Sequence, residues 1–177
     1  MKKSRLVCTA FIFSLITACS GGGESSGPAV NKGSSQPTPI DDAPAVDNED
    51  LTPGLKGIDA NANGIRDDID RFIASHYSAS SMMKKVAEKQ ARAFQMSMEA
   101  ATSEEAKKAG NAIFLAGDCA YKFLPHATED DMKFVESMSI EIKALTANTT
   151  ERFSAYWRGE ELASGMVFYS NDDPDCE

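Results

Sequence analysis

Hydrophobic runs and positive charge are both scarce in this sequence of 177 residues. Beyond the first twenty residues, no apolar run approaches the roughly 20 residues that a membrane-spanning helix needs. The sequence therefore excludes a chain that crosses the bilayer after its amino terminus. Lys and Arg number 18, against 27 Asp and Glu. Because such a surface repels phosphate backbones, nucleic acid is excluded as a partner.

Catalytic motifs are missing as well. The sequence contains no H-E-x-x-H zinc motif, no G-x-S-x-G elbow and no phosphate-binding loop. Ser81 and Lys84 have the S-x-x-K spacing of penicillin-recognising enzymes, but neither S-D-N nor K-T-G accompanies them. There are two histidines, His76 on the apolar stripe of a predicted helix and His126 in a predicted loop. We therefore predict no catalytic residue.

The amino terminus has the three parts of a secretory signal. Met1–Arg5 carries three positive charges, and Leu6–Ile16 is an apolar run too short to span a bilayer as a helix. The run closes with Ile-Thr-Ala before Cys19. We predict that residues 1–18 are a signal peptide.

This ending resembles the lipobox of bacterial lipoproteins. The resemblance implies that diacylglycerol is attached to Cys19, that the chain is cleaved before it and that the new amino terminus is acylated, for example with palmitate. Ser20, in place of Asp, implies sorting to the outer membrane, on its periplasmic or surface face. The alternative is an ordinary signal peptide with an incidental cysteine.

We predict that residues 19–50 consist of the lipidated cysteine followed by a disordered tether. Gly, Ser, Pro, Ala and Asp dominate the segment, so it cannot bury enough apolar surface to offset the entropy of ordering it. A flexible coil of this length would span roughly 30 Å.

Removing residues 1–18 leaves 15 basic and 27 acidic residues, a formal charge of −12. Only the acyl chains should therefore hold the protein to a membrane.

Two of the four cysteines are expected to keep an unmodified thiol in the mature chain after export and lipidation. Cys8 leaves with the signal peptide and Cys19 carries the lipid. Because the exported setting is oxidising, we predict a disulfide between Cys119 and Cys176. A closed loop of this size contributes roughly 4 kcal/mol to stability. Two free thiols or a metal pair are the alternatives.

Residues 51–177 form one predicted all-α domain, a small bundle of about five helices. Apolar residues recur at helical spacing almost throughout. Three predicted buried stripes are Ile69, Phe72, Ile73, His76 and Tyr77; Met83, Ala87, Ala91, Phe94 and Met98; and Phe134, Val135, Met138, Ile142 and Leu145. Between the last two, a further predicted helix runs through Ile113 and Phe114. A fifth helix carries Phe153, Tyr156 and Trp157, of which Tyr156 and Trp157 are expected to be core aromatics.

Capping residues set the expected helix boundaries. Thr102 and Glu105 have the spacing of a capping box, and that helix is expected to end near Gly117. Thr128 can cap the next helix, and Thr149 or Thr150 the last. Residues 165–170 could form a short extended piece.

The strongest chemical signal lies in residues 59–70. Oxygen-bearing side chains stand at loop positions 1, 3, 5, 9 and 12, and a glycine at position 6: Asp59, Asn61, Asn63, Asp67, Asp70 and Gly64. Calcium takes six to eight hard oxygens near 2.4 Å, and this spacing wraps such oxygens around one point. We predict that the five side chains and the Ile65 carbonyl bind one calcium ion.

The loop resembles EF-hand, dockerin and thrombospondin type 3 calcium loops. It departs from a standard EF-hand in three ways. Asp70 replaces the usual Glu, the apolar Ile65 is at position 7 in place of an apolar residue at position 8, and no entering helix precedes Asp59. With two neutral amides among the first three ligands, we expect a dissociation constant of about 10⁻⁴ to 10⁻³ M. The alternative is an Asn- and Asp-rich turn that caps a helix without metal.

These observations favour a lipid-anchored envelope protein with a calcium-stabilised binding or scaffold domain that recruits an envelope protein. Two alternatives remain open. One is a small hydrolase or enzyme inhibitor that uses a cleft near His126 and the acidic tail at residues 172–177. The other is a structural lipoprotein without metal.

Overall fold

The computed structural model describes residues 47–124, 126–169 and 176. The predicted signal peptide, Cys19, most of the tether and residues 172–175 of the acidic tail lie outside this part. The described residues form five α-helices and no strand. This confirms the predicted all-α bundle. The helices are α1 (Asp67–His76), α2 (Ser81–Glu99), α3 (Ser103–Phe123), α4 (Glu129–Thr146) and α5 (Thr150–Leu162).

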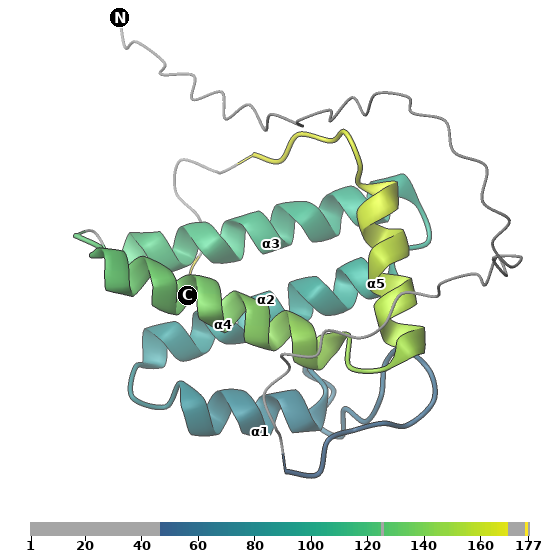
Figure 1. Cartoon of the computed structure of the whole chain (residues 1–177), viewed down its shortest axis with the longest axis horizontal. Coiled ribbons are helices and arrows are strands. Elements are labelled where there is room, and N and C mark those ends of the chain that lie inside the picture. Colours follow the sequence, from purple (N-terminus) through teal and green to yellow (C-terminus); the bar gives the residue numbers. More distant parts are fainter. Residues whose placement is uncertain (1–46, 125, 170–175, 177) are drawn as a thin grey trace, which may run out of the picture. The chain divides into compact units, whose positions relative to one another are not determined.

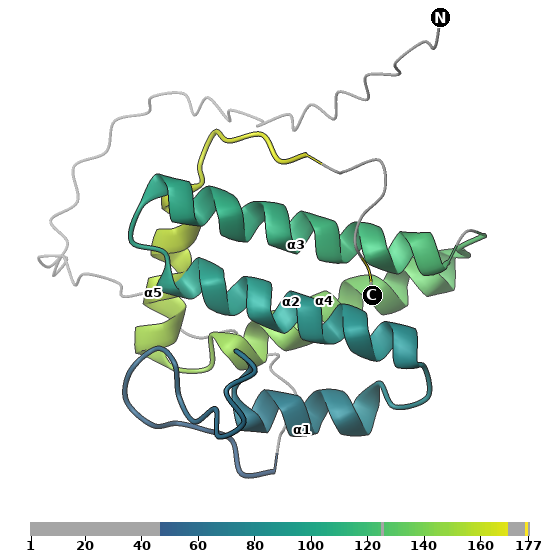
Figure 2. The same ribbon diagram turned by 180° about the vertical axis from the view of Figure 1, so that it is seen from behind.

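The helices surround one core to which all of them contribute. In both views α2 and α3 lie side by side and α1 lies along the other edge of α2 (Figures 1 and 2). α4 packs across α2, and α5 stands across one end of α2 and α3. Fully buried residues at the centre include Ile69, Ile73, Met98, Met138, Ile142 and Leu145.

Side-chain caps start four of the helices. Ser80, Thr102, Thr128 and Thr149 each accept a hydrogen bond from a backbone N–H in the first turn of the following helix. The predicted capping box of Thr102 and Glu105 is present. Asp131 completes an analogous box with Thr128. Each cap satisfies donors that a helix start otherwise leaves without a partner.

Three details of the sequence prediction are wrong. α3 continues to Phe123, past its expected end at Gly117. A methyl group at Gly117 would meet no atom within 4 Å, so this glycine faces open space within the helix and does not end it. Phe134 and Trp157 are 46% and 55% exposed, although each was expected in the core. His76 is also exposed, and it stacks on Phe72.

Close backbone contact joins α2 to α5. A side chain at Gly159 would collide with the backbone carbonyl oxygen of Ser97. The missing Cβ thus lets the two helices approach at this crossing. Gly110 has the same role on α3, where the ring of Phe168 occupies the space of a Cβ.

Residues 163–169 follow α5 as a short segment without helix or strand structure. Met166 and Phe168 are half-buried, whereas Val167 and Tyr169 are 63% and 66% exposed. Exposure therefore alternates along residues 166–169.

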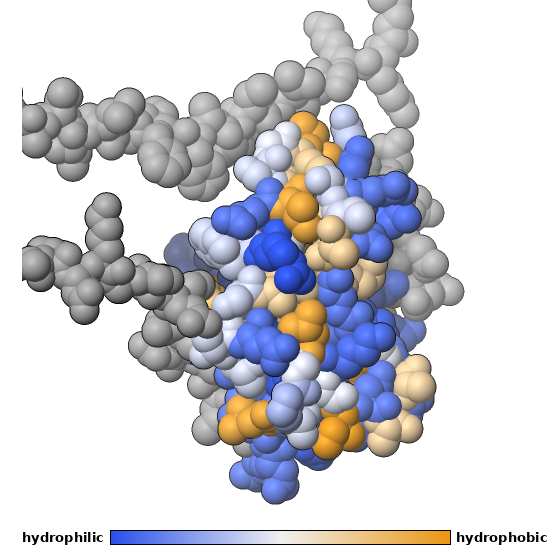
Figure 3. Space-filling model, turned by 90° about the vertical axis from the view of Figure 1, so that its right-hand side faces the viewer, coloured by the Kyte–Doolittle hydropathy of each residue, from blue (hydrophilic) through white to orange (hydrophobic). Residues whose placement is uncertain are grey.

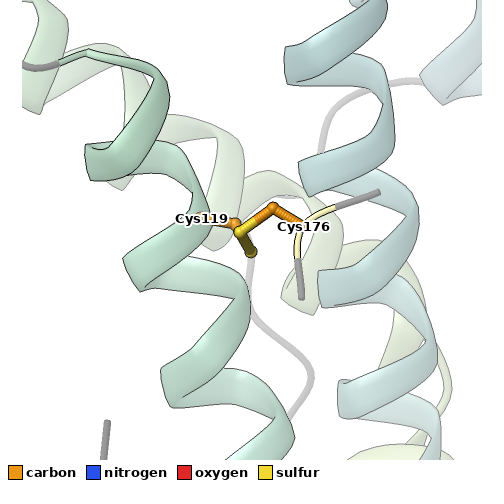
Figure 4. Close-up of a disulfide and its surroundings, with 2 residues drawn as sticks. All are labelled: Cys119 and Cys176. Carbon is orange, nitrogen blue, oxygen red and sulfur yellow. A yellow bond between two sulfur atoms is a disulfide. The ribbon is translucent and has the colours of Figure 1, made fainter. Parts of the chain in front are cut away.

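A disulfide bond connects Cys119 on α3 to Cys176, with the Cα atoms 5.5 Å apart (Figure 4). Both cysteines are buried, with exposures of 1% and 4%. Cys176 is thereby fixed to the core covalently.

Candidate calcium site

The loop ahead of α1 is organised around Asp59. Its Oδ1 accepts a hydrogen bond from Asn63 N (3.1 Å), and its Oδ2 accepts one from Gly64 N (2.9 Å). Gly64 has a φ of 81°, a backbone conformation that favours glycine. The carboxylate of Asp59, at loop position 1, therefore fixes the turn at Asn63 and Gly64, loop positions 5 and 6.

The two asparagines converge on Asp70. Asn61 Nδ2 and Asn63 Nδ2 both donate to Asp70 Oδ2, at 3.1 and 2.8 Å. Their Oδ1 atoms accept from the backbone N–H groups of Asn63 and Ile65. A carbonyl oxygen has two lone pairs, so each oxygen that already accepts one hydrogen bond can still bind a cation. The structure thus brings positions 3, 5 and 12 together.

Asp67 and Ile65 complete the predicted ligand set. Asp67 Oδ1 accepts from Ala60 N at 3.0 Å, which ties position 9 to position 2. Ile65 is 1% exposed and its side chain belongs to the core cluster. Only its carbonyl oxygen can therefore serve as a ligand.

These donors match the chemistry of calcium, which prefers hard oxygen ligands. The three carboxylates are, however, not gathered on one point: within the described part of the chain, no group of three His, Cys, Asp or Glu side chains is arranged to hold a metal ion. The amide groups of Asn61 and Asn63 carry the contact to Asp70 instead.

The inner side of the same loop contains an ion pair that the sequence analysis missed. Arg66 and Asp68 form this pair, and they are only 2% and 1% exposed. Arg66 also donates to the carbonyl oxygens of Leu145 (2.8 Å) and Thr146 (3.5 Å) in the last turn of α4. A cation is stabilising there because unpaired carbonyls carry negative charge at a helix end. The loop is thus attached to α4.

A second buried arginine holds the segment that precedes the loop. Arg152 of α5 is 0% exposed. It donates to the carbonyl oxygens of Asp50, Thr52 (3.1 Å) and Gly54 (3.1 Å). Its charge is balanced within the cluster by the carboxylates of Asp50 and Asp68. Contacts of the domain therefore begin before residue 51, its predicted start.

The carboxyl group of Asp50 is 3.8 Å from Arg152 and 3.9 Å from Arg66. Burial opposes its ionisation, but hydrogen bonds from Thr52 and Ile58 and the charge of Arg152 outweigh burial and lower its pKa to about 2. Asp50 is therefore ionised at any pH near neutrality, as its two arginine neighbours require.

The other candidate residues are not assembled into a site. His126 and His76 are both exposed. The sulfur of Cys119 is held in the disulfide. Of the predicted calcium ligands, the structure brings Asn61, Asn63 and Asp70 into direct contact.

Comparison with known proteins found no matching protein family, no similar characterised protein and no similar solved structure. Within the described ranges, every helix is too short or too polar to cross a membrane.

Proposed function

We propose that this protein is a lipid-anchored protein of the bacterial outer membrane whose helical domain is stabilised by one calcium ion in the loop 59–70. The domain then serves as a binding or scaffold module for another envelope protein. The observation that carries the metal proposal is the convergence of Asn61 and Asn63 on Asp70 beneath the turn fixed by Asp59. The sequence around Cys19 supports the anchor.

The ligand count also favours calcium. Five side chains and one carbonyl supply six oxygens, the lower end of the calcium range. Asp70 has a shorter side chain than the Glu of an EF-hand, so we expect it to contribute one oxygen. The proposed role is stabilisation of the domain start, because the described residues contain one such loop.

The exposed surface of the domain carries both hydrophobic and hydrophilic residues. On the face in Figure 3, hydrophobic residues form small separate patches among hydrophilic ones. Exposed large apolar side chains of the described chain include Phe134 and Trp157. Scattered apolar residues of this kind are ordinary on protein surfaces and do not identify the partner.

Thermal and urea unfolding of the oxidised protein, first in excess chelator and then in about 5 mM calcium, test the metal proposal. With a dissociation constant of about 10⁻⁴ to 10⁻³ M, calcium should add about 1 to 2 kcal/mol to the free energy of unfolding. Asp59→Ala should abolish this gain. Asp130→Ala, which removes an exposed carboxylate from the first turn of α4, should preserve it. Equal stability of the wild type with and without calcium would leave a structural lipoprotein without metal.

Palmitate labelling in bacterial cells tests the anchor. The wild-type protein should incorporate label and sediment with outer membranes. Cys19→Ser should remain unlabelled and uncleaved, whereas Cys8→Ser should behave as the wild type. A labelled Cys19→Ser protein, or an unlabelled wild type, would contradict the lipid attachment.

A further inference from the structure

One side chain outside the loop is bonded to its backbone. Arg92 of α2 donates from Nε to the carbonyl oxygen of Asn63 at 2.9 Å. Its aliphatic stem lies beside Gly64, since a Cβ at that glycine would be 3.9 Å from Arg92 Cγ. Both contacts fall at loop positions 5 and 6. A pocket of about 510 Å³ lies between this part of the loop and α2, and Arg92 lines it.

The bonded carbonyl belongs to the same peptide unit as the Gly64 N–H. That N–H donates to Asp59 Oδ2 at 2.9 Å. A peptide unit is planar, so its two ends cannot rotate independently. Arg92 holds one end of the unit and the Asp59 carboxylate accepts from the other. The guanidinium of α2 therefore fixes the direction in which a proposed ligand carboxylate is held.

We infer that Arg92 is a positioning residue for calcium in the loop 59–70, an inference that rests on the proposed calcium site. It contacts no candidate ligand oxygen. It acts through the peptide unit between Asn63 and Gly64, which it keeps in the orientation that the Asp59 carboxylate requires.

The positive charge of Arg92 acts in the opposite direction, since it repels a bound cation. Its side chain is 40% exposed, so water and salt screen that repulsion. Arg92 also lies 3.9 Å from Glu88, which offsets part of the charge. The hydrogen bond is a direct contact at 2.9 Å, so screening weakens it less than it weakens a repulsion across a longer distance. Positioning should therefore outweigh repulsion.

Calcium titration of the full chain in nonionic detergent, followed by calorimetry, tests this. Arg92→Ala should raise the dissociation constant about five- to ten-fold, the effect of one hydrogen bond from a charged donor at a partly exposed site. Arg92→Lys keeps the charge but lacks the planar Nε–H donor, so its dissociation constant should also rise. Lys85→Ala is the charge control, because it removes an exposed positive charge two turns away on the same helix.

A second measurement separates positioning from general destabilisation. Unfolding in chelator should give similar midpoints for the wild type and both Arg92 variants, while the amide resonance of Gly64 shifts. An unchanged or lower dissociation constant in Arg92→Ala would overturn the inference and leave the calcium site standing. A wild type that does not bind calcium would overturn both.

Discussion

Arg66 and Asp68, two positions apart in the chain, form a bidentate ion pair inside the domain, with Nε–Oδ1 at 2.6 Å and Nη2–Oδ2 at 2.9 Å. This pair divides the loop into two sides. Asp59, Asn61 and Asn63 lie on the outer side with the other candidate ligands, and the ion pair lies on the side that faces α4 and α5. Because one short segment forms both sides, changes on the buried side should affect the outer one.

Substitution of Gly57 tests how tightly the buried side is packed. This glycine has a φ of 64°, and a Cβ here would collide with Arg66 Cδ and Asp50 Oδ2. Both neighbours are buried and held by hydrogen bonds, so neither can move freely. Gly57→Ala should lower the free energy of unfolding by about 2 to 4 kcal/mol in urea titrations.

Gly117 provides the matched control. It lies within α3 with no atom near its missing side chain. Gly117→Ala should raise stability by about 0.5 to 1 kcal/mol, because alanine is the better helix former. Equal effects of the two substitutions would show that packing around Gly57 is not the cause.

The low pKa of Asp50 predicts a loss of stability in acid. Its folded-state pKa of about 2 is below the ordinary 3.8, so the unfolded chain binds the proton first as pH falls. The contribution is complete above about pH 5 and declines toward pH 2, by about 2 kcal/mol. Urea unfolding between pH 6 and pH 2 measures it.

Asp50→Asn isolates this contribution from those of the other carboxylates. The variant should be less stable than the wild type at pH 6, because it cannot balance the charges of Arg66 and Arg152. The difference between the two proteins should narrow as the pH approaches 2. A constant difference across this range would contradict the assigned role of the Asp50 charge.

Loss of the disulfide should cost about 4 kcal/mol, the entropy that a closed loop of this length removes from the unfolded chain. Cys119→Ser, Cys176→Ser and the double variant should lose similar amounts, since each removes the same bond. Urea unfolding without reductant measures the three. A much larger loss in Cys119→Ser alone would indicate that packing of this buried side chain dominates.

The contact between Gly110 and Phe168 predicts non-additive mutations. Gly110→Ala should favour α3 but displace the Phe168 ring from the space it occupies. In the wild-type background we expect a loss of about 1 to 2 kcal/mol from such overpacking. In a Phe168→Ala background the same change should be neutral or stabilising. Additive effects in this double-mutant cycle would refute the contact.

Helix positions were largely predictable from the sequence because periodicity and caps are local signals. Thr102 and Glu105, for example, both mark the start of α3 within four residues. The end of α3 was not predictable in the same way. Gly117 resembles a helix end in sequence, but whether a glycine ends a helix depends on the backbone that follows it.

Exposure of single aromatic residues depends on tertiary packing that no local pattern contains. Val135, Met138, Ile142 and Leu145 are all buried on α4. Phe134 lies one position from this stripe, about 100° around the helix, and contacts Tyr77 edge to face at its boundary. Trp157 likewise lies one position from the half-buried Tyr156 on α5.

The candidate ligands could be found from the sequence because their spacing is a local motif. The buried charges could not. Asp50, Arg66, Asp68 and Arg152 come from three separate parts of the chain, and charged residues are usually exposed. The weak signal was Arg66 itself, at the loop position where EF-hands carry an apolar residue. Arg66 is buried in the structure, where its charge is paired with that of Asp68. A charged residue can therefore occupy this position.

The bonds of Arg152 also determine where the domain would bear tension. Any pull on the chain ahead of Asp47 reaches the described residues at Asn48, Glu49 and Asp50. There Arg71 holds the carbonyl of Asn48, Asn148 holds Glu49 and Asp50, and Arg152 holds the next turns of the segment. Force from the proposed membrane anchor would thus pass into α1 through Arg71 and into the corner between α4 and α5. The backbone N–H of Asp50 also donates to Asp68 Oδ2 at 2.9 Å, so part of the load would reach the loop 59–70 on its buried side.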